Sequence, residues 1–146
     1  MVRVLLFFLF VSVTGCSMKV PPGEVENILT VNRGDKTHWI RTKAQIPIYP
    51  FNALKQRVDG CVNVSYIVNA SGGVESLKVI SSYPNSVFNK SALRAVKQYR
   101  YQAAEKNTEK ILVRTNEIVT FLLEYPDYRS PSKEEMVKKC EIVVRN

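Results

Sequence analysis

The chain has 146 residues, a formal net charge of +8 and 45% hydrophobic residues, which is typical of one basic globular domain with a core large enough to fold unaided. Its lysines and arginines are dispersed, so no dense basic tract marks a nucleic-acid-binding surface. The sequence also lacks the motifs of phosphate-binding loops, serine-hydrolase elbows and zinc proteases, which argues against these classes of enzyme.

The amino-terminal segment, residues 1–15, has the make-up of a signal peptide. An apolar run from Val4 to Val13 follows Arg3, and it is too short for a membrane-spanning helix, which needs about 20 apolar residues. The run ends in Val-Thr-Gly-Cys, which resembles the lipobox of bacterial lipoproteins and implies cleavage before Cys16 and lipid on its thiol. An ordinary cleaved signal and an uncleaved short anchor are the alternatives.

Residues 16–43 are predicted to be the lipidated cysteine and a tether, because they show neither sustained alternation nor a helical period and contain Pro21-Pro22-Gly23. The single histidine, His38, lies here with no second ligand at metal-binding spacing, so we expect no metal and no cofactor. Carboxylates are spread along the chain without a pair placed for acid–base catalysis, so we expect no catalytic residue. Export argues against nucleic acid as a partner.

Residues 44–126 are predicted to form the folded domain, which begins with an extended segment, a short helix and a hairpin. The prolines of Gln45–Pro50 favour extended backbone, and residues 51–58 can form the helix. A half-buried strand follows from Gly60, and a second strand over residues 74–81, with Ser71–Gly73 as the turn between them. The alternating apolar residues of the first strand are Val62, Val64, Tyr66 and Val68.

The second half of the domain reads as a helix, a short extended piece and a long strand. Apolar residues then recur at helical spacing, and Asn85 or Ser86 can cap this helix. They are Phe88, Ala92, Ala95, Val96 and Tyr99. Residues 101–104 are extended, and residues 111–125 form the longest predicted strand.

Residues 127–146 are predicted to be a carboxy-terminal extension. Ser132 and Glu135 have the spacing of a capping box ahead of a short helix, and Cys140–Val144 reads as an extra strand. Cys61 and Cys140 are the two cysteines that lipidation would not use, and in an oxidising compartment they predict a disulfide. Two separate buried thiols are the alternative.

Several short motifs in the domain resemble the carboxy-terminal domain of TonB proteins. They are Pro47-x-Tyr49-Pro50, Ala53, Gly60-x-Val62-x-Val64, Ala70-Ser71-Gly72-Gly73-Val74, Val79, Ser81-Ser82, Phe88, Ala92, Ala95-Val96 and Tyr99-Arg100-Tyr101-x-Ala103. The resemblance implies a two-layer α+β fold, with one helix packed on a small antiparallel sheet in the order strand, strand, helix, strand. The chain departs from the family pattern at Gln102, where proline is usual, and at Tyr99, where tryptophan is common.

The resemblance also implies that the domain captures an extended peptide by adding it as a strand to a sheet edge, near the plug of an outer-membrane transporter. It further implies that proteins of this family transmit force from a proton-driven motor in the inner membrane to such a transporter. By position, the strand edge would be Ile118, Val119, Thr120, Phe121, Leu122 and Leu123, with Gln45, Pro47, Tyr49 and Pro50 as its flank. The alternative role for these residues is ordinary sheet pairing at the start and end of the domain.

Together these observations predict a non-catalytic, periplasm-facing lipoprotein that binds a protein segment in envelope transport. A TonB-type energy transducer working with partner subunits is the alternative, as is a structural or assembly lipoprotein. The sequence has neither the uncleaved membrane helix nor the long proline-rich spacer of a transducer, and Ser17 after the lipidated cysteine favours the outer membrane. The expected partner is an envelope protein such as a TonB-dependent transporter or a Tol-like component, and a homodimer is compatible with the sequence.

Overall fold

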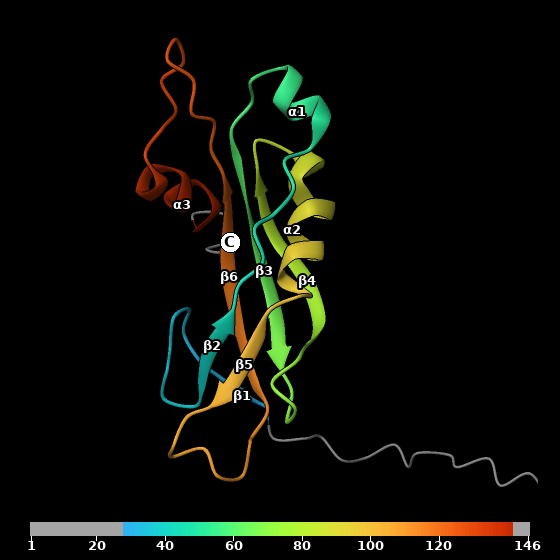
Figure 1. Ribbon diagram of the computed structural model, residues 1–146, viewed down its shortest axis with the longest axis vertical. Helices are drawn as coiled ribbons and strands as arrows, with labels where there is room; N and C mark the ends of the chain where they lie inside the picture. Colours follow the sequence, from blue (N-terminus) through green and yellow to red (C-terminus); the bar gives the residue numbers. More distant parts are fainter. Residues whose placement is uncertain (1–27, 142–146) are drawn as a thin grey trace, which may run out of the picture.

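The structure is a computed structural model that describes residues 28–141. In chain order its elements are β1 (Leu29–Thr30), β2 (Trp39–Lys43), α1 (Phe51–Lys55), β3 (Gly60–Val68), β4 (Val74–Tyr83), the 3-10 turn η1 (Ser86–Phe88), α2 (Asn89–Val96), β5 (Arg100–Ala103), β6 (Val113–Phe121) and α3 (Lys133–Glu141). The described part is elongated, with α1 at one end and β2 and β5 at the other (Figure 1).

The strands form a four-stranded sheet in the order β1-β6-β3-β4 and a two-stranded sheet of β2 and β5. β3 runs antiparallel to β4 and to β6, as predicted. β1 runs parallel to β6, so the larger sheet is mixed rather than purely antiparallel. The α+β class, with strand, strand, helix and strand in succession, is confirmed.

The main core lies between the sheet and α2. The predicted alternation places Val62, Val64, Tyr66 and Val68 on one face of β3, where each is at most 1% exposed. Phe88 stacks on Phe121 of β6 with ring centroids 4.6 Å apart. The Asn85 side chain accepts a hydrogen bond from the Val87 amide at 3.0 Å and so caps η1, which leads into α2, whereas α2 itself begins without a side-chain cap.

The hairpin between β3 and β4 is positioned by Gly72, which has a positive φ of 76°. Its carbonyl accepts a hydrogen bond from the Tyr101 amide at 2.9 Å, so the hairpin tip contacts β5. A Cβ atom at this position would lie 2.0 Å from the Tyr101 carbonyl oxygen. Glycine is therefore required here both for the turn and for the close approach of two backbones.

The described part of the predicted tether is folded, which corrects the prediction for residues 28–43. β1 and β2 both come from this segment, and β2 pairs with β5. The physical reason is Trp39, which is 5% exposed and donates from Nε1 to the Ile111 carbonyl at 2.9 Å. Because β2 is short and exposed beyond Trp39, its sequence shows no alternation. The signal peptide, Cys16 and the prolines at 21 and 22 lie outside the described residues.

The carboxy-terminal extension forms α3, which covers the face of the sheet opposite α2. The predicted capping box is present: the Ser132 amide donates to the Glu135 carboxylate at 2.7 Å, and the Glu135 amide donates to the Ser132 hydroxyl at 3.1 Å. Met136 and Cys140 are one helical turn apart and both are buried, so Cys140 belongs to α3 and not to the predicted strand. Residues 142–146 lie outside the described part.

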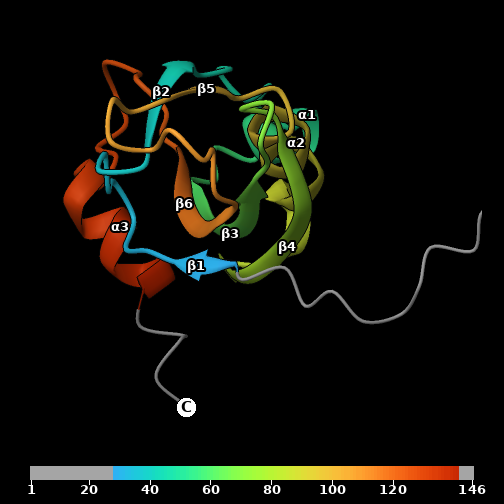
Figure 2. The ribbon, with the colours of Figure 1, turned by 90° about the horizontal axis from the view of Figure 1, so that it is seen from below.

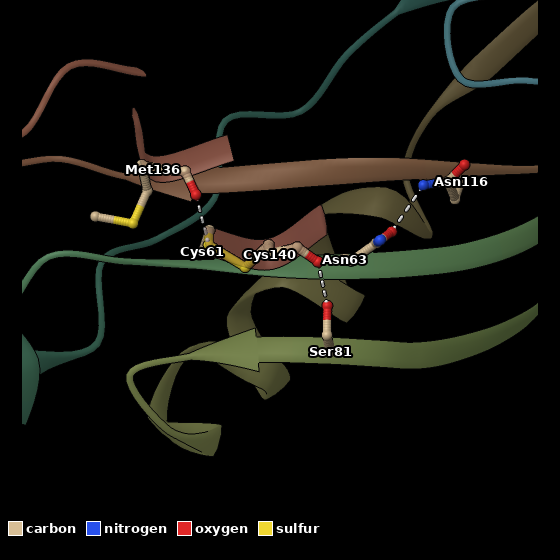
Figure 3. Close-up of a disulfide and its surroundings, with 6 residues drawn as sticks. All are labelled: Cys61, Asn63, Ser81, Asn116, Met136 and Cys140. Atoms are coloured by element: carbon tan, nitrogen blue, oxygen red, sulfur yellow. Dashed lines mark hydrogen bonds between the residues drawn. A yellow bond between two sulfur atoms is a disulfide. The ribbon is translucent and has the colours of Figure 1, made fainter. Parts of the chain in front are cut away.

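The predicted disulfide between Cys61 and Cys140 is present, with an S–S distance of 2.04 Å (Figure 3). It joins β3 to the last turn of α3. Beside it, the Ser81 hydroxyl of β4 donates to the Cys140 carbonyl at 2.6 Å. Both bonds tie α3 to the central strands.

Among residues 28–141, no helix is long and apolar enough to cross a membrane.

Candidate functional site

The larger sheet lacks full strand pairing on two sides: the outer side of β4, which is its last strand, and the outer side of β6, where four of the predicted edge residues lie. On its inner side, β6 pairs with β3 along its whole length, from Val113 to Phe121. On its outer side, β1 pairs only with Val113 and Arg114. The Leu29 amide donates to the Leu112 carbonyl at 3.1 Å, and the Val31 amide donates to the Arg114 carbonyl at 2.9 Å.

The backbone groups that follow on this outer side can be assigned from strand geometry. Backbone groups of alternate residues face the same side of a strand, so those of Asn116, Ile118 and Thr120 face outward like the Arg114 carbonyl. The register with β3 is continuous here and contains no bulge. No backbone group of residues 28–141 pairs with these outward amides and carbonyls. We call residues 116–120 the β6 window.

The β6 window is bounded by β1 at its start and by the end of β6 itself at the other side. At the start, the Thr115 hydroxyl donates to the Asn32 carbonyl at 3.4 Å. Beyond Phe121, the last residue of β6, the Leu123 amide donates to the Asp59 carboxylate at 2.8 Å, and the Leu123 carbonyl accepts the Ser130 hydroxyl. The window is therefore about 16 Å long.

The structure thus places the predicted edge residues in two groups. Ile118, Val119, Thr120 and Phe121 lie in β6, whereas Leu122 and Leu123 lie beyond its end. The Val119 amide faces β3, because its neighbours on either side face outward. Leu123 is 6% exposed and both of its backbone groups are used. Within β6, the unpaired outward backbone groups consequently start earlier, at Asn116, than the sequence predicted.

One side of the β6 window is bordered by β2. Arg41 Nη1 lies 2.9 Å from Glu117 Oε2, and the Arg41 guanidinium lies 4.9 Å from the centre of the Tyr99 ring. A pocket of about 310 Å³ separates β2 from β6 and is lined in part by Trp39, Arg41, Tyr66, Tyr101 and Glu117. This pocket opens beside the first residues of the window.

The phenols near this pocket are neutral at physiological pH. Burial raises the pKa of Tyr99 to about 12, although the nearby Arg41 cation opposes the shift. Burial also raises the pKa of Tyr66 and of Tyr101, and their hydroxyl groups lie 2.6 Å apart. They act as hydrogen-bonding and packing groups. Within residues 28–141, no cluster of histidine, cysteine and acidic side chains is arranged to hold a metal ion.

The other side of the β6 window is bordered by α3. Ile118 is 4% exposed and packs in a cluster with Cys61, Met136 and Cys140. Leu122 and Val137 are half-buried against the same cluster. In Figure 2, α3 lies to the left of β6 and β2 lies above it, and these two elements come from opposite ends of the described chain.

The predicted flank, residues 45–50, anchors the chain to the core near the end of β6. The Tyr49 ring meets Phe88 and Phe121 edge-on, with both centroid distances 5.7 Å, and its hydroxyl donates to the Val58 carbonyl at 2.7 Å. Gln45, Pro47 and Pro50 are half-buried. These residues border the domain core, and no described contact places them in the β6 window.

The sequence analysis missed three exposed apolar side chains, two within this flank and one directly after it. Ile46, Ile48 and Phe51 are 83%, 70% and 73% exposed. The signal was the alternation within residues 45–49, in which Tyr49 turns inward and the two isoleucines turn outward. The prolines favour extended backbone but do not indicate which of the intervening side chains face solvent.

Comparisons with known proteins agree with this architecture. The family model for the Gram-negative bacterial TonB protein C-terminal matches residues 45–123. The chain is 34% identical over 62 residues to protein TonB of Klebsiella aerogenes, covering 42% of this chain and 26% of that protein. It is 30% identical over 56 residues to protein TonB of Escherichia coli, covering 38% of this chain and 23% of that protein. The matched part thus spans about a quarter of these curated relatives.

A solved structure shows the same fold at low identity. The solution NMR structure of the Pseudomonas aeruginosa TonB CTD matches with a TM-score of 0.56 and 17% identity, and the match covers 68% of this chain and 97% of that one. The family-matched range 45–123 contains β3, β4, α2, β5 and β6, whereas β1, β2 and α3 lie outside it. Because the family model matches more than half of the chain, this protein belongs to the family of Gram-negative bacterial TonB protein C-terminal domains.

Proposed function

We propose that this domain captures a short extended protein segment by adding it as a strand to the β6 window. The observation that supports this most directly is β1, in which the chain already adds two of its own residues to the same side of β6. The next outward groups, at Asn116, Ile118 and Thr120, have no backbone partner among residues 28–141. A guest strand would continue the pattern that β1 begins.

The physics of strand addition fits this geometry. Unpaired amides and carbonyls on a sheet edge supply affinity, and side chains beside the edge supply selectivity. The window of about 16 Å accommodates a guest of about five residues. The TonB family is non-catalytic, so the function of the domain is binding.

For the whole protein, the comparisons support the TonB-type transducer more than a stand-alone binding lipoprotein, because the curated relatives that match are TonB proteins. The proposed partner is a periplasm-facing segment of a TonB-dependent outer-membrane transporter, or a Tol-like component with the same extended form. This places the domain in the cell envelope, facing the periplasm.

Lipid on Cys16 is a separate proposal about the anchor, supported by the lipobox-like residues 13–16. Mass spectrometry of the protein extracted from its native membrane tests it. We expect an amino-terminal peptide that begins at Cys16 and carries acyl chains, and we expect Cys16→Ala to remove them. An unmodified Cys16 in the mature protein would contradict the proposal.

The experiment on the β6 window replaces Asn116 with a photo-crosslinking residue in the native envelope. We expect crosslinks to extended segments of an outer-membrane protein, mapped by mass spectrometry, and none of these from the exposed Lys78 of β4. Adding Thr120→Pro removes one outward amide, so we expect capture to fall at least tenfold. Thr120→Ala is the control, since it keeps the amide.

The folded state of each variant is checked by the fluorescence of Trp39, the single tryptophan. Equal capture from positions 116 and 78, or unchanged capture by folded Thr120→Pro protein, would argue against strand addition at β6.

A further inference from the structure

α3 borders the β6 window, although it lies outside the range that the TonB family model matches. It covers the face of the sheet opposite α2 and contacts β3, β4 and β6 (Figure 2). The following inference rests on the proposed function, because it concerns which strand the β6 window accepts.

The contact between α3 and the window is apolar. Ile118, the middle residue of the window, packs with Met136 and the disulfide of Cys61 and Cys140. At the rim of this cluster, Val137 and Leu122 are half-buried, so each keeps part of its surface in solvent. Side chains of paired strands stand next to each other on the same face. A guest residue opposite Ile118, on the same face of the sheet, would therefore lie beside Val137.

α3 is held in place by bonds at both of its ends. The capping box of Ser132 and Glu135 fixes its first turn. At its last turn, the Cys61–Cys140 disulfide is fully buried and the Cys140 carbonyl accepts the Ser81 hydroxyl (Figure 3). Glu141, also in this turn, pairs with Arg33 of the loop after β1. The position of Val137 relative to β6 is consequently set before any guest arrives.

We propose that α3 forms one side of the site at which a guest strand binds the β6 window. We propose further that Val137 selects an apolar guest side chain at the position opposite Ile118. An apolar residue there removes its own surface and that of Val137 and Leu122 from water. A charged residue at the same position loses hydration without gaining a partner, so it is disfavoured. The partner is therefore an extended segment with an apolar residue at one defined position.

The test uses the full chain with an intact disulfide and an array of six-residue synthetic peptides. Each peptide position is varied in turn among valine, lysine and aspartate. For the natural sequence, we expect one position at which lysine or aspartate weakens binding at least tenfold relative to valine. This position identifies the residue that lies beside α3.

Val137→Asp should then reverse the preference at that position, so that lysine binds at least fivefold better than valine. A loosened or unfolded α3 would weaken all peptides alike and would not create a new preference. Lys138→Gln is the control, because Lys138 is exposed on α3 and the change lowers the net charge by the same amount. The control should keep the preference for valine.

The outcomes separate the two proposals. If peptides bind but Val137→Asp leaves the preference for valine unchanged, α3 does not contact the guest strand. The proposal of strand addition at β6 is then retained. If no peptide binds and position 116 yields no specific crosslink, both the proposed function and this inference are wrong.

Discussion

Arg41 Nη1 lies 2.9 Å from Glu117 Oε2, and this ion pair connects the β2–β5 sheet to β6. Arg41 comes from the segment before the family-matched range, whereas Glu117 lies inside it and within the β6 window. The Arg41 guanidinium also covers the Tyr99 ring. One side chain thus joins the amino-terminal strands both to the core and to the edge proposed to bind a peptide.

The coupling between these two residues should be measurable but small. Both side chains are partly exposed, at 36% and 24%, so water screens the pair and its coupling energy should be about 0.5–1 kcal/mol. The cycle of Arg41→Met, Glu117→Gln and the double variant, followed by urea unfolding, measures this value. Arg41→Met alone should cost more than Glu117→Gln alone, because it also removes the contact with Tyr99. A coupling energy near zero would show that the ion pair between Arg41 and Glu117 does not contribute to stability.

Gly72→Ala should destabilise the domain by about 2 kcal/mol or more, because alanine disfavours the positive φ and its Cβ would clash with the Tyr101 carbonyl. Gly34→Ala is a matched control. Gly34 also has a positive φ, of 82°, but a Cβ there meets nothing within 4 Å. The control should therefore cost only the backbone contribution of about 1–2 kcal/mol. Equal losses in urea unfolding would show that the close approach to β5 is unimportant.

Loss of the disulfide should lower the free energy of unfolding by about 4 kcal/mol, because the Cys61–Cys140 bond closes a long loop of 79 residues in the unfolded chain. The double variant Cys61→Ala/Cys140→Ala, compared with the oxidised protein in urea, measures the effect. The fluorescence of Trp39, which lies outside the α3 cluster, should report that the main core persists. A loss below about 1 kcal/mol would show that the bond adds little to the fold.

Stability should fall as the pH rises above about 10, the ordinary pKa of tyrosine. Burial raises the pKa of Tyr99 to about 12 and also raises that of Tyr49, Tyr66 and Tyr101. Above pH 10 the unfolded chain therefore binds fewer protons than the folded chain, so the free energy of unfolding decreases with pH. For Tyr99, this stabilisation is complete below pH 10 and is lost as the pH rises to about 12.

Urea unfolding between pH 8 and pH 11, with the disulfide verified intact, measures this dependence. Each tyrosine that ionises only after unfolding contributes a slope of about 1.4 kcal/mol per pH unit. Tyr99→Phe should reduce the slope by up to that amount. A slope that Tyr99→Phe leaves unchanged would indicate that Tyr99 ionises freely in the folded protein.

Local patterns determined most of the family-matched domain. The period-two run from Val62 to Val68, the glycines at 72 and 73 and the helical stripe around Ala92 each depend on near neighbours in the chain. The same holds for the capping box of α3, because its two partners are three residues apart. The structure confirms these elements, since the physics that forms them is short-range.

The sequence by itself determined the hairpin, α2, β6, the α3 cap and the cysteine pair as candidates for a bridge. Only the tertiary structure decided that residues 28–43 fold, because the strand pairing of β2 with β5 and the burial of Trp39 join segments far apart in the chain. It also decided the limits of the β6 window. The start of the window depends on β1 and on Asn32, which lies 83 residues before Thr115, and no local pattern records such long-range hydrogen bonds.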